Sequence, residues 1–154
     1  MFSQTVEYAL RAMVQLAYTS SDGCSTDVLA QSTQVPRAYL SKVLQGLRRA
    51  GLVRSQRGIG GGVYLERPPE QISILEVINA VEPVERILTC PLGLKSHGSR
   101  LCPLHAKVDS AIALIQESFC NTTLADIIAT GTYGSRPLCE SPTPAEPQMP
   151  SFEK

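Results

Sequence analysis

Apolar residues in the first half of the chain recur at helical spacing, and they predict three helices. The first covers residues 4–19, because its apolar positions fall three or four residues apart on one face: Val6, Leu10, Met13, Val14 and Ala17. The turn-forming run at 20–23 ends this helix. A second, short helix over residues 28–31 follows Ser25, whose hydroxyl can cap the exposed N–H groups of a helix start.

The third predicted helix begins at Pro36, a residue favoured at the first helical position, and Gly51 stops it. Its buried face has the spacing i, i+3, i+4, i+7 at Leu40, Val43, Leu44 and Leu47. Its opposite face carries basic, amide and hydroxyl side chains: Arg37, Ser41, Lys42, Gln45, Arg48 and Arg49. A short helix, a turn at 32–35 and a longer helix of this kind are the pattern of a helix-turn-helix, whose second helix enters the DNA major groove.

A β-hairpin is predicted directly after the third helix. Residues 52–55 and 63–65 read as strands, and residues 56–62 form a glycine-rich tip. Glycines at the tip let the backbone approach a phosphate or a narrow minor groove, into which Arg57 could insert. Each part alone has an ordinary alternative, an αα-hairpin with a solvated face and a flexible β-turn. Together they predict a winged helix-turn-helix over residues 1–68, within a fold that is mainly α with a small β-wing.

The charge distribution supports a nucleic-acid partner, although the formal net charge of the chain is zero. Residues 1–68 hold eight Lys and Arg against four Asp and Glu, a net charge of +4, and the rest of the chain therefore carries −4. Residues 36–57 contain six basic residues and no acidic one. Basic groups near phosphates release condensed counterions, and Arg, Lys and Gln can read base edges. The expected DNA contacts are Arg37, Tyr39, Ser41, Lys42, Gln45, Arg48, Arg57, Gly60 and Gly61.

Several stretches of the sequence resemble one family. They are Glu7 to Ala12, Tyr39 to Leu44, Ala50 to Val53, the wing run Arg57-Gly58-x-Gly60-Gly61-Gly62-x-Tyr64, and Ile72 to Ile78. Over residues 1–128 the chain is similar to the IscR/NsrR/CymR-type bacterial winged-helix transcription regulators. This resemblance implies a homodimer that binds a palindromic operator on double-stranded DNA.

The second half predicts a linker helix and a long helix. Ser73 and Glu76 have the spacing of a capping box, which places a short helix within a linker at 69–89. Residues 103–120 carry an apolar stripe over four turns, and Asn121 or Thr122 could cap a last helix over 124–129. We expect residues 103–130 to form the dimer interface, since the two half-sites of an operator need two DNA-binding domains. Residues 131–154 contain five prolines and predict a disordered tail or an extended strap.

Residues 90–105 contain both histidines of the chain and two of its five cysteines, at the spacing Cys90-x6-His97-x4-Cys102-x2-His105. Thiolate and imidazole together are the ligands of zinc and iron–sulfur sites, so the loop predicts metal or redox chemistry. The alternative is two buried cysteines and two surface histidines. Of the other cysteines, we expect Cys24 and Cys120 to be structural and Cys139 to be exposed.

The family resemblance implies a particular ligand set. Members with a 2Fe–2S cluster place three cysteines at six-residue steps here, and some add a histidine three residues after the last. Cys90, Cys102 and His105 match this pattern, whereas Ser96 stands at the middle position. The fourth ligand would be the adjacent His97, or Glu7, which matches an acidic ligand that some relatives recruit from the first helix. Relatives without a cluster exist, and two Cys with two His would also suit zinc.

Composition excludes other classes. No apolar run is long enough to span a membrane, and the start lacks the charged and apolar regions of a secretory signal, so a cytoplasmic protein is expected. No acid/base pair lies near the histidines in sequence, which argues against a zinc hydrolase or another enzyme. We expect a transcription regulator that senses redox state, nitric oxide or iron–sulfur status. The alternative is a metal-free or zinc-bound regulator that responds through a protein partner or another ligand.

Overall fold

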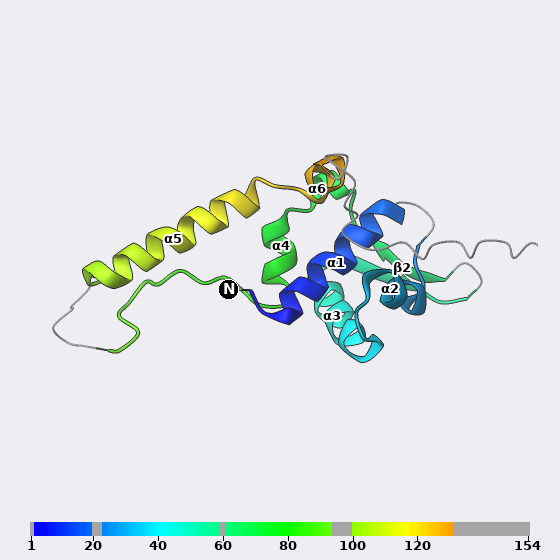
Figure 1. Ribbon diagram of the computed structural model, residues 1–154, viewed down its shortest axis with the longest axis horizontal. Coiled ribbons are helices and arrows are strands. Elements are labelled where there is room, and N and C mark those ends of the chain that lie inside the picture. The colour runs from blue at the N-terminus through cyan, green and yellow to red at the C-terminus, as the bar shows by residue number, and fades with distance from the viewer. Residues whose placement is uncertain (1, 20–22, 59–60, 94–99, 131–154) are drawn as a thin grey trace, which may run out of the picture.

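The computed structural model of this 154-residue chain describes residues 2–19, 23–58, 61–93 and 100–130. A head of helices with a small sheet carries the N-terminal half, and one long helix, α5 (Pro103–Cys120), extends from it as an arm (Figure 1). Within the described residues the sheet has two antiparallel strands. The predicted fold class, mainly α with a small β-wing, is confirmed.

Three helices form the core of the head: α1 (Gln4–Thr19), α2 (Thr26–Thr33) and α3 (Arg37–Arg49). The first helix has the predicted bounds, and Ser25 caps α2 by accepting a hydrogen bond from the N–H of Val28. The second helix is longer than predicted. The hydroxyls of Ser32 and Thr33 donate to the carbonyl of Leu29, so these expected turn residues complete the last helical turn. The chain then turns at Gln34, which has a left-handed φ of 56°.

The wing consists of β1 (Val53–Gln56) and β2 (Gly62–Leu65), with Val53 opposite Leu65 and Gln56 opposite Gly62. Cys24 adds a short third pairing, since its backbone exchanges hydrogen bonds of 2.9 and 2.8 Å with Val63. The Cys24 side chain is buried, as predicted for a structural cysteine, and burial raises the pKa of its thiol. This pairing ties the wing to the start of the helix-turn-helix.

A short 3-10 turn, η1 (Pro69–Gln71), leads from the wing to α4 (Ile74–Asn79), and α6 (Leu124–Thr130) packs beside η1. The predicted capping box is present: Ser73 accepts from the N–H of Glu76, and the Glu76 carboxylate accepts from the N–H of Ser73. Two backbone bonds of 2.9 Å join the segments, from Ile74 N to Thr122 O and from Leu124 N to Ile72 O.

Two details at the end of α5 differ from expectation. The last helix begins with reciprocal hydrogen bonds between Thr123 and Asp126, so Thr123 has the role that was assigned to Asn121 or Thr122. Cys120 is exposed, so the prediction that it is structural is wrong: at this end of α5 the half-buried Phe119 packs against the core, and Cys120 does not. None of the described helices is both long and apolar enough to span a membrane.

Candidate DNA-binding surface and ligand loop

The recognition-helix candidate, α3, is held by its apolar face and by a well-formed C-terminal cap. Leu40, Val43 and Leu47 are buried in the core of the head. At the C-terminus, Gly51 has a φ of +69°, its N–H bonds to Arg48 O, and the next N–H bonds to Leu47 O. This pair of bonds is a Schellman motif, which favours glycine at the left-handed position. The helix is therefore fixed in rotation and in length, and its other face stays in solvent.

All predicted contact residues of α3 lie on that exposed face: Arg37, Tyr39, Ser41, Lys42, Gln45 and Arg48. Arg37 forms an exposed ion pair of 2.9 Å with Asp27 of α2. The Tyr39 ring is 59% exposed and lies 6.1 Å, centroid to centroid, from the ring of Tyr8 on α1. An exposed ion pair contributes little free energy, so Arg37 can exchange Asp27 for a phosphate or a base.

The wing presents a second basic group. Arg54 stacks over the Tyr64 ring at 4.6 Å from its centroid, and this ring in turn covers Gly23. The turn at the tip closes through a 2.8 Å bond from Gly61 N to Gly58 O, and a Cβ at Gly61 would lie 2.6 Å from Gln56 O. Only glycine fits there, so the packing of the turn requires glycine at position 61, whether or not Gly61 contacts DNA as predicted. Arg57 is exposed, and Gly60 lies outside the described residues.

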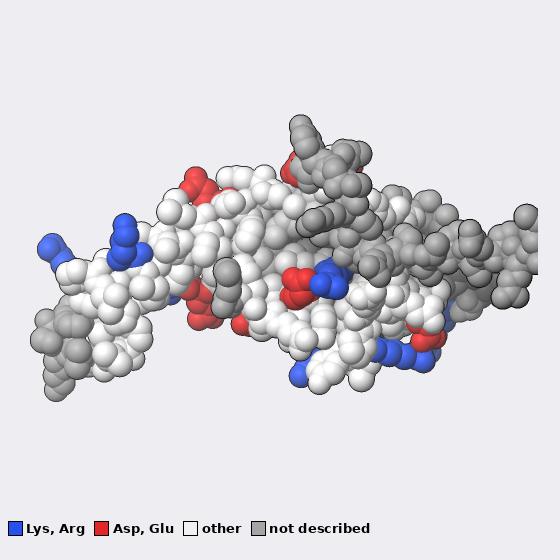
Figure 2. Space-filling model, in the orientation of Figure 1, with Lys and Arg blue, Asp and Glu red and all other residues white. Residues whose placement is uncertain are grey.

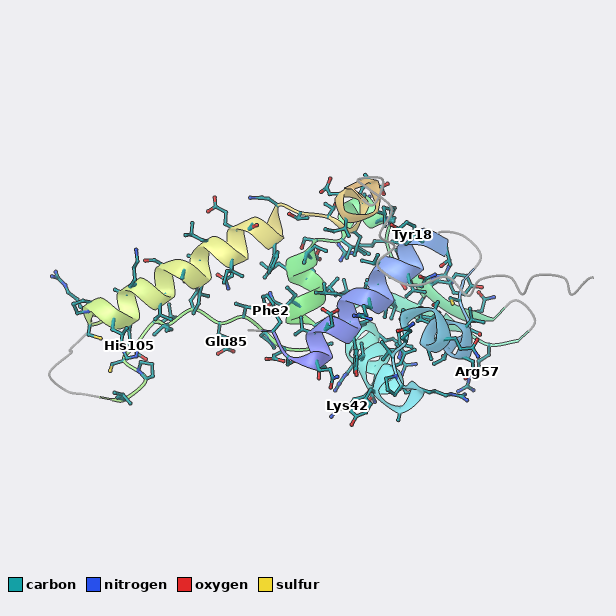
Figure 3. All side chains as sticks on the ribbon, viewed as in Figure 1. Phe2, Tyr18, Lys42, Arg57, Glu85 and His105 are labelled. Atoms are coloured by element: carbon teal, nitrogen blue, oxygen red, sulfur yellow. The ribbon has the colours of Figure 1, made fainter. Side chains whose placement is uncertain are left out.

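A depression of about 190 Å³, with both polar and apolar lining, lies between α3 and the wing. Its lining comes from both elements and from the start of α2: Thr26, Ser41, Leu44, Gln45, Arg48, Ser55 and Val63. Figure 2 shows basic side chains along the edge of the molecule that α3 forms. Lys42 and Arg57 project from this same edge in Figure 3. The surface made by α3 and the wing can thus present cations and amides to a double helix.

Residues 90–105, which we call the ligand loop, run in chain order into the N-terminal end of α5. Cys102 is the residue before the first helical position, and its Sγ lies 3.3 Å from Nδ1 of His105, one turn into the helix. Cys90, Cys102 and His105 are all half-buried. The start of a helix favours anionic groups, and the Cys102 side chain does not cap it. Cys102 and His105, two of the candidate ligands, therefore lie side by side on one rigid element.

The segment that leads to Cys90 is tied along α5. Arg86 donates to both carboxylate oxygens of Asp109, at 2.6 and 2.5 Å, and the backbone N–H of Ile87 donates to the same carboxylate at 2.9 Å. The Arg86 guanidinium holds the pKa of Asp109 below its ordinary value, and the Ile87 N–H lowers it further. Gln116 donates to the carbonyl of Val84 at 2.6 Å. Sequence reasoning missed these contacts, because no local pattern links residues more than twenty positions apart.

The remaining candidate ligands lie elsewhere. Glu7 pairs with Arg11 at 2.8 Å and lines an apolar cavity of about 460 Å³ together with Ser118, Phe119 and Thr122, at the C-terminal end of α5. His105 lies at the opposite end of that helix (Figure 3), about 20 Å away along the axis from Ser118. His97 and Ser96 lie outside the described residues. Within the described ranges, no three acidic, Cys or His side chains come together as a metal site.

Comparison with known proteins assigns the chain to one family. The model of the Rrf2 family, described as iron-dependent transcriptional regulators, matches residues 2–130. A helix-turn-helix-type transcriptional regulator of Aquifex aeolicus is 32% identical over 130 residues, which cover 82% of this chain and 90% of that protein.

Two solved structures are similar in fold. CymR, the global cysteine regulator of B. subtilis, superposes with a TM-score of 0.70 at 26% identity, over 84% of this chain and 96% of that one. IscR of T. potens has a TM-score of 0.68 at 28% identity, over 89% and 92%. With the winged helix-turn-helix, these matches show that the chain belongs to the Rrf2 family of DNA-binding transcriptional regulators, which are not enzymes.

Proposed function

We propose that this regulator is a homodimer that binds a palindromic operator through α3 and the wing and senses redox state, nitric oxide or iron–sulfur status through a 2Fe–2S cluster. The observation that supports the sensing role is the Cys102–His105 pair, 3.3 Å apart at the start of α5. Thiolate and imidazole ligands suit iron–sulfur clusters, and nitrogen ligands raise the reduction potential of a cluster relative to four thiolates.

The exposed apolar residues of α5 support the dimer. Leu104 and Leu114 are 68% and 67% exposed, and Val108 and Ile115 add to the same helix at 42% and 40%. Large apolar side chains at this density on an isolated arm favour burial against another surface. A second copy of α5 would supply an equivalent apolar surface and would bring a second α3 to the adjacent half-site.

The available donors fit a cluster with mixed ligands. Cys90, Cys102 and His105 would supply three of them. The fourth would be His97 from the same loop, or Glu7 of a second copy, since about 20 Å of helix lies between the Glu7 cavity and His105 of one chain. When bound, the cluster supplies reversible one-electron chemistry and reactivity toward nitric oxide. The ligand loop would hold it at one end of α5, whose other end packs on the head through the Phe119 and Phe2 rings, 5.7 Å apart.

Coupling between loop and DNA follows from this arrangement. A ligand state can change operator affinity only if it favours one placement of the two heads over another. Because α5 joins the ligand loop to α4 and α6, a change in the loop alters how the arm meets the head. The spacing between the two recognition helices would then differ between the states.

The experiment is anaerobic purification with absorption and Mössbauer spectroscopy. We expect a coloured protein with cluster bands that Cys102→Ala abolishes and that Cys120→Ala, which removes an exposed thiol at the other end of α5, leaves unchanged. A colourless protein with bound zinc would favour the alternative, a zinc-bound regulator, and one with no metal would favour a regulator that answers to a protein partner. Either result would refute the cluster.

A further inference from the structure

Arg86, Asp109 and the backbone of Ile87 form a clamp between the linker and α5, which we call the Arg86–Asp109 clamp. Both oxygens of the carboxylate accept from the guanidinium, and one also accepts from the Ile87 N–H. The Asp109 side chain is only 15% exposed, against 41% for Arg86. A bidentate ion pair with a third hydrogen-bond donor fixes the direction of the linker on α5 as well as its distance from the helix.

A second contact sets the register of the linker on the helix. Val84 lies against Gln116, and Ile87 lies against Asp109. A step of three residues along the linker, from Val84 to Ile87, therefore corresponds to a step of seven residues back along α5, from Gln116 to Asp109. In length, three extended residues span about 10 Å and seven helical residues about 10.5 Å, so the two advances agree.

The same step, taken once more, leads from Ile87 to Cys90 on the linker and from Asp109 to Cys102 on α5. Continued in this way, the register would bring Cys90 level with Cys102 along the helix axis, where Cys102 pairs with His105. Figure 1 shows the linker following α5 toward its N-terminal end. The register thus directs toward one another two candidate ligands that are twelve positions apart in the sequence.

We propose that the Arg86–Asp109 clamp is a positioning device that sets the reach of Cys90 to Cys102 and His105. The proposal rests on the proposed role of these residues as ligands. Neither Arg86 nor Asp109 touches the metal in this scheme. The clamp holds the linker before any metal arrives, so less chain entropy is lost when the ligands close around it.

The test uses the full chain without metal, with Cys24, Cys120 and Cys139 replaced by Ser so that only Cys90 and Cys102 remain. In a glutathione redox buffer, one protein thiolate attacks oxidised glutathione, breaks its S–S bond, forms a mixed disulfide and releases one glutathione thiolate. The second protein thiolate then displaces the other glutathione thiolate and closes the Cys90–Cys102 disulfide, so that oxidised glutathione is the two-electron oxidant. The equilibrium constant gives the effective concentration of one thiol at the other. We expect Asp109→Asn to lower this value about tenfold, in the range seen when partners that orient ligands are removed. Glu117→Gln, an exposed acid on the same helix, should leave it unchanged.

Arg86→Lys provides a second variant, which keeps the positive charge but cannot form the bidentate pair with Asp109. It should lower the effective concentration in the same direction, with an unchanged circular dichroism spectrum. The proposal would be overturned if the effective concentration of the two thiols is the same in the two-cysteine protein with and without Asp109→Asn or Arg86→Lys. Cobalt(II) titration of the same proteins separates the two proposals. If the wild type binds no metal while the thiol effect persists, the clamp stands and the metal site fails.

Discussion

Removal of one exposed cation from α3 gives a quantitative test of the DNA-binding surface. Lys42 lies on the solvent face of the recognition-helix candidate, between Ser41 and the buried Val43. Each phosphate neutralised by a protein contributes about −0.9 to the slope of log K against log salt. If Lys42 of both heads meets a phosphate, Lys42→Ala should make the slope shallower by about 1.8. Between about 50 and 200 mM salt, the wild type should then lose roughly tenfold more affinity than the variant.

The assay is fluorescence anisotropy with a duplex of random sequence, titrated at several salt concentrations. Lys107→Ala is the matched control, because it removes the same charge from the exposed surface of α5, near the ligand loop. Neither change should alter stability by more than about 0.5 kcal/mol, since both side chains are exposed. The reasoning is refuted if the two variants have equal slopes, or if only Lys107→Ala makes the slope shallower.

Three further predictions concern the head. Ser73→Ala should lower the free energy of unfolding by about 1 kcal/mol in a urea titration, because it removes the N-cap of α4, and Ser73→Thr should retain most of it. Burial tends to raise the pKa of Glu76, but hydrogen bonds from Arg67 and Ser73 outweigh burial and lower this pKa in the folded protein. The Glu76 contribution to the free energy of unfolding is therefore fully present above the unfolded pKa of about 4.3, and it is lost as pH falls through the folded pKa. Glu76→Gln should therefore lower the free energy of unfolding near neutral pH, and the difference from wild type should close as pH falls through the folded pKa of Glu76; a difference that stays constant with pH would contradict this origin. Gly23 and Gly93 both have a φ of +63°, but a Cβ at Gly23 would lie 2.3 Å from the ring of Tyr64, whereas a Cβ at Gly93 would meet nothing within 4 Å. Gly23→Ala should therefore lower Tm more than Gly93→Ala, and equal decreases in Tm would show that the contact with Tyr64 does not matter.

The head could be predicted from the sequence because its signals are local. The stripe of α1, the Ser25 cap, the Gly51 stop and the Ser73–Glu76 box each lie within a few residues of what they determine. The end of α2 was missed, because Ser32 and Thr33 can form either a turn or a last helical turn, and packing against the core decides between them.

The ligand loop could be predicted only in part. Spacing alone places His105 one turn after Cys102, and the structure has these two side chains in contact distance. The contacts of Arg86 and Gln116 depend on how the linker lies on α5, which no short-range pattern specifies. The separation of Glu7 from Cys102 and His105 is likewise a property of the folded arm.

Operator affinity with and without the cluster tests the central claim most directly. An operator selected by the protein from random-sequence duplexes would be titrated with anaerobically isolated protein and with the same preparation after removal of iron. A coupling of 1–3 kcal/mol is typical of allosteric proteins, so the two affinities should differ by about 5- to 150-fold. Equal affinities for cluster-loaded and cluster-free protein would contradict a sensing role for the ligand loop.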